Sequence, residues 1–274
     1  MMEFFTASDG TRLAYRVTGS GQPLFCLAGL TRTVRDFDYL AANLADVQMI
    51  CMDYRGRGQS EWSGAETYKV AIEGRDALEL LDHLGLSRVP VLGTSRGGII
   101  GMLLAAVAKD RIAGLCLNDI GPEIARDGLD EIKQYVGRNP LAKTHQEAAD
   151  AMAANLKTFA NVPRSRWLEE ARIHFRSTGD GLAITYDPAL RASFLEDYDA
   201  TVPDPWIGFD ALDGLPVALL RGANSNLLTL ETADEMRRRR PDLIYAEIPD
   251  RGHIPFLDEP ASLDAIRAFL KAVA

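Results

Sequence analysis

Short apolar segments that alternate with helical patterns constrain the fold of this 274-residue chain more than any other feature. Each segment is a few residues long, rich in Val, Ile and Leu, and followed by loop residues, which is typical of buried parallel strands. The segments are residues 24–28, 47–52, 89–92, 115–118, 217–221 and 244–248. Helical spacing lies between and after them, for example at Leu263, Ile266 and Leu270. This alternation predicts an α/β fold with an open, mostly parallel sheet and helices on both faces.

Residues 121–208 interrupt the alternation. They show helical patterning without a convincing parallel strand, and they are too many for a plain loop between two core strands. We predict that they form a helical lid (cap), inserted into a core of residues 1–120 and 209–274. The aromatic side chains that we expect to cover the site and contact substrate are Trp167, Phe175, Tyr186 and Trp206.

Composition argues against several classes of protein. The net charge of −9 disfavours nucleic-acid partners, because neutralising phosphates requires clustered Lys and Arg. The N-terminus lacks the basic and apolar regions of a signal peptide, and no apolar run is long enough to span a membrane. We therefore expect a cytoplasmic protein without membrane contact, whose partner is a small-molecule substrate. The sequence does not define an oligomeric state.

Cysteine usage and motif content predict neither disulfides nor a cofactor. The chain has an odd number of cysteines, and they are widely spaced in apolar segments: Cys26, Cys51 and Cys116. This distribution indicates reduced thiols in the core. We find no metal-ligand cluster and no dinucleotide-binding glycine motif. The sequence therefore predicts a protein without metal or cofactor.

One serine has the surroundings of a nucleophile. Residues 93–97, Gly-Thr-Ser-Arg-Gly, match G-x-S-x-G between a predicted buried strand and an amphipathic helix. The glycines at both ends allow strand and helix to approach while a strained turn presents Ser95. The alternative is an N-capping serine between packing glycines. The motif's strand–helix context favours a nucleophile.

At this point the chain resembles the α/β-hydrolase family over nearly its whole length. The matching motifs, in order, are "CLAGLTR" (26–32), "MDYRGRGQS" (52–60), "GTSRGG" (93–98) and "DRGHIPFLDEP" (250–260). The resemblance implies an eight-stranded, mostly parallel sheet. It also implies Ser95 as nucleophile, His253 as general base, and the backbone N–H groups of Leu30 and Arg96 as the oxyanion hole.

Two of these residues need separate comment. His253 is one of four histidines, and it is the one that follows a glycine in a loop after the last predicted strand. The side chain of Arg96 is unusual beside the serine. It either binds a substrate carboxylate or, as we slightly favour, pairs with an acid of the fold such as Asp119 or Glu123.

The triad acid is the open question. Many related sequences read G-x-x-S-D after the strand at 217–221, whereas this chain has Asn226 at the place of the acid. Asn226 is an engineered replacement of Asp, or Asp119 supplies the acid from another strand, or Asn226 itself orients the histidine. We favour the first explanation, because the surrounding loop keeps the family's pattern in all but that residue.

The leading functional prediction is a serine hydrolase that cleaves a small carboxylic ester or lactone through an acyl-enzyme. A carbon–carbon bond hydrolase of the same fold is the first alternative, because such enzymes keep Ser and His. A non-catalytic protein that binds a small ligand is the second, and Asn226 is its only support.

Overall fold

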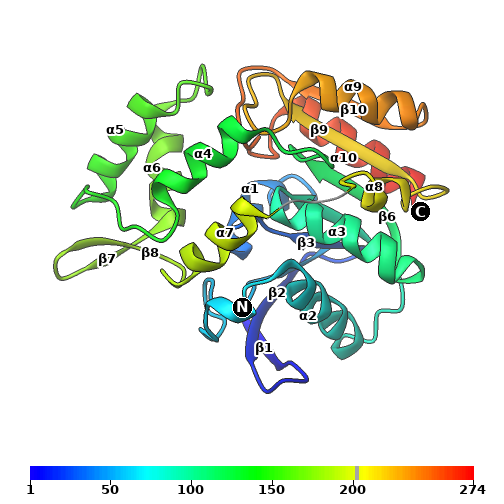
Figure 1. Cartoon of the computed structure of the whole chain (residues 1–274), viewed down its shortest axis with the longest axis horizontal. Helices are drawn as coiled ribbons and strands as arrows, with labels where there is room; N and C mark the ends of the chain where they lie inside the picture. Colours follow the sequence, from blue (N-terminus) through cyan, green and yellow to red (C-terminus); the bar gives the residue numbers. More distant parts are fainter. Residues whose placement is uncertain (201–203) are drawn as a thin grey trace.

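An eight-stranded sheet forms the centre of the molecule in the computed structural model, which describes residues 1–200 and 204–274 (Figure 1). Along the sheet the strands follow the order β1-β2-β4-β3-β5-β6-β9-β10. Their bounds are β1 (Glu3–Thr6), β2 (Arg12–Thr18), β3 (Gln22–Leu27), β4 (Val47–Met52), β5 (Val89–Thr94), β6 (Ile112–Asn118), β9 (Val217–Gly222) and β10 (Ile244–Ile248).

Strand direction follows the predicted pattern. β2 pairs antiparallel with both β1 and β4, and the remaining neighbours, from β4 through to β10, pair in parallel. The apolar segments found in the sequence correspond to β3, β4, β5, β6, β9 and β10; the bounds of β4 and β10 agree with the prediction, and those of the other four differ by up to three residues. The prediction of a mostly parallel sheet is confirmed.

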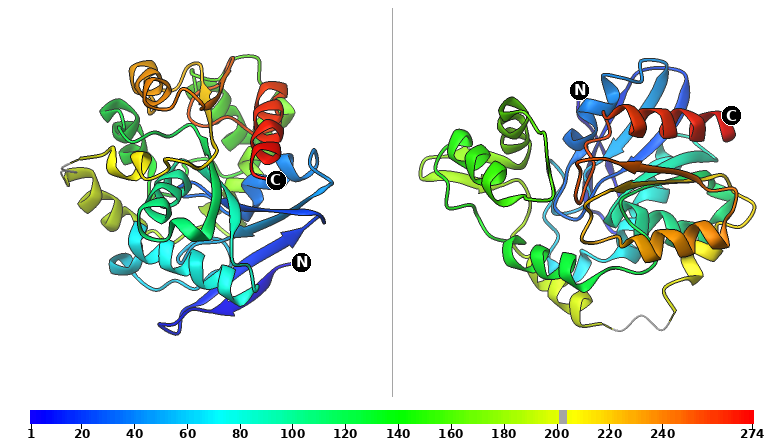
Figure 2. Two further views of the ribbon diagram at one scale, coloured as in Figure 1. Left: turned by 90° about the vertical axis from the view of Figure 1, so that its right-hand side faces the viewer. Right: turned by 90° about the horizontal axis from the view of Figure 1, so that it is seen from above.

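Helices cover both faces of this sheet, as predicted. Figure 2 shows α1 and α10 on one face, with α2 and α3 on the other. α3 packs on β3, β5 and β6, while α10 packs on β9 and β10. The bounds are α1 (Asp38–Ala41), α2 (Val70–His83), α3 (Arg96–Val107), α9 (Leu230–Arg239) and α10 (Pro260–Ala272), with short 3₁₀ turns η1 (Val34–Phe37), η2 (Ala65–Thr67) and η3 (Lys109–Arg111).

The chain between β6 and β9 leaves the sheet. Residues 121–200, called the inserted segment below, gather on one side of it (Figure 1). Their elements are α4 (Arg126–Tyr135), α5 (His145–Asn155), α6 (Arg164–His174), β7 (Phe175–Thr178), β8 (Gly181–Ile184) and α7 (Leu190–Asp199). Two small apolar clusters, one around Tyr186 and one around Trp167, are distinct from the main core. The antiparallel β7–β8 hairpin was not anticipated by the helical pattern.

Trp206 lies with the sheet domain rather than with the inserted segment. It precedes the short helix α8 (Ile207–Asp210), which packs against α3, and it belongs to the main hydrophobic core. Residues 201–203, which the predicted lid boundary includes, lie outside the described residues.

The three cysteines are buried and free, which agrees with the predicted core thiols. Burial raises the pKa of Cys116 to about 12, so the thiol stays protonated near neutral pH. Across residues 1–200 and 204–274, no helix has the length and apolar character needed to cross a membrane.

Candidate active site

Ser95 occupies a strained turn between β5 and α3. Its φ is +50°, a backbone conformation that side-chain-bearing residues rarely adopt. The flanking glycines make the turn possible. A Cβ on Gly97 would lie 2.0 Å from the carbonyl oxygen of Leu27, and one on Gly93 would lie 2.5 Å from that of Gly97. The strand and the helix therefore meet too closely at this turn for any larger residue at either position.

Three side chains form a hydrogen-bonded chain at the ends of β5, β6 and β10. The distance from Ser95 Oγ to His253 Nε2 is 2.9 Å, and from His253 Nδ1 to Asp119 Oδ2 it is 2.7 Å. Asp119 directly follows β6 and is fully buried, while His253 lies in the loop between β10 and α10. This order of hydroxyl, imidazole and carboxylate is the geometry that activates a serine for nucleophilic attack.

Two further hydrogen bonds hold the carboxylate of Asp119, one to each oxygen. The backbone N–H of Gly222 donates to Asp119 Oδ1 at 2.7 Å, and the hydroxyl of Ser225 donates to Asp119 Oδ2 at 2.6 Å. The Ser225 oxygen in turn accepts from the backbone N–H groups of Leu227 and Leu228. These bonds fix the direction in which the carboxylate faces His253.

Asn226 does not take the place of the acid, which corrects the explanation favoured from the sequence. Its side-chain amide donates to Glu131 Oε2 at 2.6 Å, and it makes no hydrogen bond to His253 within residues 1–200 and 204–274. The physical reason is the position of the two loops: the end of β6 already brings Asp119 against His253, and Asn226 points toward α4. Of the competing explanations, the geometry favours the acid from β6.

The loop after β3, where the oxyanion hole was predicted, lies against Ser95. A Cβ built on Gly29 would be 3.8 Å from Ser95 Cβ, so the backbone next to Leu30 borders the serine. Among the described residues, no acceptor is hydrogen-bonded to the backbone N–H of Leu30 or of Arg96. Two open donors beside Ser95 suit an anionic oxygen.

The Arg96 side chain has a structural partner, but not one of those expected. Its Nε donates to Glu73 Oε2 at 2.5 Å, and an Nη2 group donates to the carbonyl of Tyr68. Asp119 faces His253 instead, and Glu123 accepts a hydrogen bond from the indole of Trp206. The partner comes from α2, which packs against the start of α3, and a sequence pattern does not reveal that contact.

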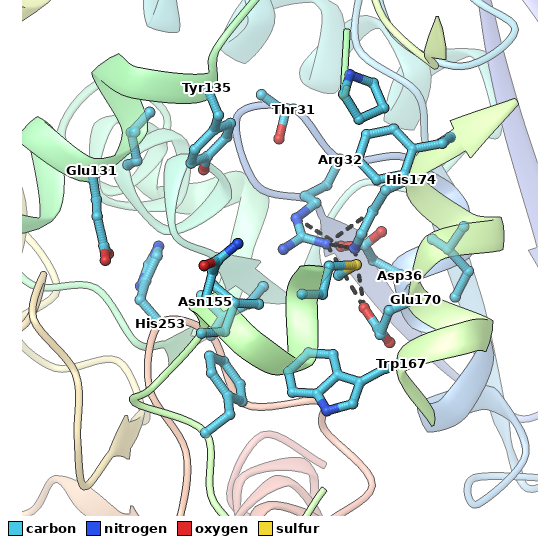
Figure 3. A pocket seen from close by; sticks show the side chains of 18 of the residues that line it. Thr31, Arg32, Asp36, Glu131, Tyr135, Asn155, Trp167, Glu170, His174 and His253 are labelled. Atoms are coloured by element: carbon cyan, nitrogen blue, oxygen red, sulfur yellow. Dashed lines mark hydrogen bonds and ion pairs between the residues drawn. The ribbon is translucent and has the colours of Figure 1, made fainter. Parts of the chain in front are cut away.

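A cavity of about 830 Å³ adjoins His253 and extends under the inserted segment (Figure 3). Trp167, Phe175 and Tyr186, three of the four aromatic residues expected to face substrate, line it. Trp206 does not line this cavity, because its indole Nε1 bonds to Glu123 at 3.0 Å and its ring packs edge-on against Phe209. The remaining lining is mixed, with apolar side chains such as Phe159, Ile173 and Phe256 beside polar and charged ones.

A charged cluster on the cavity wall was missed at the sequence level. Arg32 follows the predicted oxyanion loop, and its Nη1 contacts both ring nitrogens of His174 (Figure 3). Its Nε is 3.6 Å from Asp36 Oδ2, and its Nη1 is 4.0 Å from Glu170 Oε2. His174 also bonds to Glu170 at 3.0 Å. The arginine within "GLTR" was visible in the sequence, but two of its partners, Glu170 and His174, come from α6, which the pattern could not place.

Burial and the nearby charges affect the two carboxyl groups of this cluster differently. Burial raises the pKa of Asp36. Burial acts in the same direction on Glu170, but its hydrogen bond to His174 and the charges of His174 and Arg32 outweigh it, so the pKa of Glu170 is lowered. In the described residues, this cluster included, no set of His, Cys, Asp and Glu side chains is arranged to hold a metal ion.

Comparison with known proteins gives concordant matches over most of the chain. A family model described as the alpha/beta hydrolase fold matches residues 22–260. A 3-hydroxybutyrate-oligomer hydrolase from Cupriavidus necator is 36% identical over 92% of this chain and 90% of its own length. An esterase from Mycobacterium tuberculosis is 25% identical over 93% of this chain and 84% of its own length. The crystal structure of an alpha/beta hydrolase from Novosphingobium aromaticivorans superposes with a TM-score of 0.93 at 37% identity, covering 99% of this chain and 98% of the other.

Proposed function

Because the chain belongs to the alpha/beta hydrolase fold family and is a hydrolase, we propose that it cleaves a small carboxylic ester through an acyl-enzyme on Ser95. The observation that carries this proposal is the hydrogen-bonded chain from Ser95 through His253 to buried Asp119. Asp119 would hold the imidazole in the tautomer that accepts a proton at Nε2 and would stabilise the imidazolium that results.

The first half-reaction forms the acyl-enzyme. Ser95 Oγ attacks the ester carbonyl carbon while its proton passes to His253 Nε2. The carbonyl oxygen becomes an anion that the N–H groups of Leu30 and Arg96 are placed to receive, an interaction worth about 3 kcal/mol for one such donor. When the tetrahedral intermediate collapses, the bond to the alkoxide oxygen breaks, and the leaving alcohol takes the proton from His253.

The second half-reaction regenerates the serine. Water attacks the acyl carbon, giving one proton to His253 Nε2, and the carboxylic acid leaves as the proton returns to Ser95 Oγ. These steps use only the protein's own side chains and backbone.

The proposed substrate class is an ester of a short hydroxy acid, or the corresponding lactone. Two features support it: the similarity to a 3-hydroxybutyrate-oligomer hydrolase, and a cavity of about 830 Å³ that suits a short chain rather than a polymer. We propose further that the inserted segment acts as a lid, because Trp167, Phe175 and Tyr186 extend from it into the cavity wall.

The non-catalytic alternative rested on Asn226 as a missing acid, and the contact of Asp119 with His253 counts against it. A carbon–carbon bond hydrolase would use the same Ser95 and His253, although the Arg96 side chain, engaged by Glu73, offers it no carboxylate ligand. A comparison of substrates therefore separates this alternative from an esterase.

Active-site labelling and a substrate panel test the proposal together. A fluorophosphonate probe should label the wild-type protein at Ser95 and leave Ser95→Ala unlabelled, while both proteins unfold at similar temperatures. A panel of short esters, lactones and carbon–carbon cleavage substrates should show turnover of esters that Ser95→Ala loses. Wild-type rates in Ser95→Ala, or turnover of carbon–carbon substrates alone, would contradict the assignment.

A further inference from the structure

The guanidinium of Arg32 lies in the cavity that His253 also lines, and the Arg32 side chain starts from backbone beside Ser95. A point 3.8 Å from Ser95 Cβ, where a Cβ on Gly29 would lie, is only 3.1 Å from Arg32 Cγ. Arg32 therefore leaves the backbone next to Ser95 and extends along the wall. Figure 3 shows its guanidinium in the cavity, between His253 on one side and His174 with Glu170 on the other.

Several N–H groups of this guanidinium have no hydrogen-bond acceptor in the described residues. Its Nη1 contacts His174, whereas Nε and Nη2 donate no hydrogen bond to any group in residues 1–200 and 204–274. The distances to Asp36 and Glu170, 3.6 Å and 4.0 Å, are those of ion pairs without a hydrogen bond. The Arg32 side chain keeps 26% of its surface exposed, so a ligand in the cavity can reach it.

The apolar side chains around Arg32 strengthen its interaction with an anionic ligand. Trp167, Phe175 and Ile173 line the same cavity, and a charge-assisted hydrogen bond is electrostatically stronger beside apolar groups than in water. A carboxylate presents two acceptor oxygens in a plane, which the planar fork of an arginine matches better than any neutral group does.

Asp36 and Glu170, the two acids near Arg32, leave it able to bind a carboxylate ligand. Glu170 is already hydrogen-bonded to His174, at 3.0 Å. Asp36 has one buried oxygen, Oδ1, without a partner in the described residues, and burial raises its pKa. Proton uptake by Asp36 would relieve repulsion when an anion binds, while Glu170 and His174 keep the guanidinium in place.

We propose that Arg32 binds a free carboxylate of the substrate, so that the enzyme prefers esters in which a carboxylate lies a few bonds from the scissile carbonyl. The linear dimer of 3-hydroxybutyrate, with one ester bond and one free acid, has this form. The inference rests on the proposed ester hydrolysis and adds the charge of the substrate to it.

A pair of substrates that differ only in charge tests the proposal: the linear 3-hydroxybutyrate dimer as free acid, and its methyl ester. Arg32→Gln should raise KM for the free acid about 10- to 100-fold, as expected when a hydrogen-bonded charge partner is lost, and should change the methyl ester little. Arg32→Lys keeps the charge but not the fork, so its loss should be intermediate. Arg172→Gln is the control, because Arg172 is an exposed arginine on α6 that does not line the cavity and forms no ion pair in the described residues, and it should leave both substrates unchanged.

Binding to Ser95→Ala separates this proposal from the proposed reaction. Calorimetry should show that the free acid binds more tightly than the methyl ester, and that adding Arg32→Gln removes the difference. Hydrolysis of neither dimer by the wild type would contradict ester hydrolysis of this class, yet the binding comparison would still test Arg32. Equal affinities for acid and methyl ester, or equal losses for both in Arg32→Gln and Arg32→Lys, would overturn the assignment.

Discussion

Two histidine–carboxylate pairs lie at the same cavity, and they differ in what they face. His253 and Asp119 come from loops after β10 and β6, and the free ring nitrogen of His253 contacts Ser95. His174 and Glu170 lie one turn apart on α6, and His174 contacts Arg32. The pairing distances are similar, at 2.7 Å and 3.0 Å.

A histidine–carboxylate pair therefore does not define a function by itself. The partner of the second ring nitrogen decides between proton transfer to a hydroxyl and the positioning of a cation. The two pairs also differ in origin: His253 and Asp119 meet because the sheet brings two distant loops together, whereas any helix can place a histidine and a carboxylate at i, i+4 spacing.

The largest expected effect comes from Asp119→Asn. An amide at this position leaves the shape nearly unchanged but places an N–H group toward His253 Nδ1, so the imidazole adopts the wrong tautomer. We expect kcat on a neutral ester to fall by about 10⁴-fold, the size seen for this change in a serine protease. The measurement is a steady-state rate, with circular dichroism as the control for folding. A loss smaller than tenfold would show that Asp119 is not the triad acid.

Ser225→Ala should have an intermediate effect. The mutation removes one of the two hydrogen bonds that orient Asp119 and leaves the bond from Gly222. We expect a decrease in kcat of about tenfold, the value of one hydrogen bond to a charged group. Asn224→Ala is the control, because this neighbouring side chain bonds to Thr158 instead. Equal effects of the two variants would count against a positioning role.

Glu170→Gln makes the same chemical change in the second pair, and it should leave kcat on a neutral ester within about threefold, since no proton transfer passes through α6. Its effect should appear in stability. The lowered pKa of Glu170 means that its carboxylate stabilises the folded state above the ordinary glutamate value of 4.5, and that this contribution is lost as the pH falls through the folded-state pKa.

Thermal unfolding across pH measures this contribution. The difference in Tm between wild type and Glu170→Gln should be largest near neutral pH and should shrink as the pH falls below about 4.5. A difference independent of pH would indicate a packing effect instead, and a large fall in kcat would join the second pair to the chemistry.

The smallest effect is expected for Asn226→Asp. The new carboxylate would face Glu131 rather than His253, so kcat should change by less than about threefold. Asn226→Ala separates the loss of the contact with Glu131 from the added charge. A rise in kcat of about a hundredfold or more would mean that Asn226, and not Asp119, stands behind the histidine in solution.

The parts of this molecule that depend on neighbouring residues were predictable from the sequence. Ser95 lies in a turn that the local strand, G-x-S-x-G and helix pattern identifies, although the contact that requires Gly97 is with Leu27 on β3. The strands at 47–52 and 244–248 were found at their observed bounds. His253 could be chosen because its loop follows the last strand. Each of these inferences uses a short stretch of chain.

What the sequence left open depends on which distant segments meet. Both Asp119 and Asn226 follow strands that lie side by side, and only the folded sheet decides which loop reaches His253. Arg96 pairs with an acid on α2, and Trp206 joins the main core although it lies within the predicted lid. Arg32 gains two of its partners from α6. Such contacts follow from packing of the whole chain, not from local spacing.

The position of Asp119 at the end of β6 has a consequence for how this enzyme can diversify. In the proposed mechanism the loop after β9 supplies no reacting group, so its residues could vary without loss of the chemistry, provided that Gly222 and Ser225 remain to hold Asp119. Asn226 borders the cavity. Saturation mutagenesis at this position therefore offers a route to altered substrate range in directed evolution, with little risk of inactive variants.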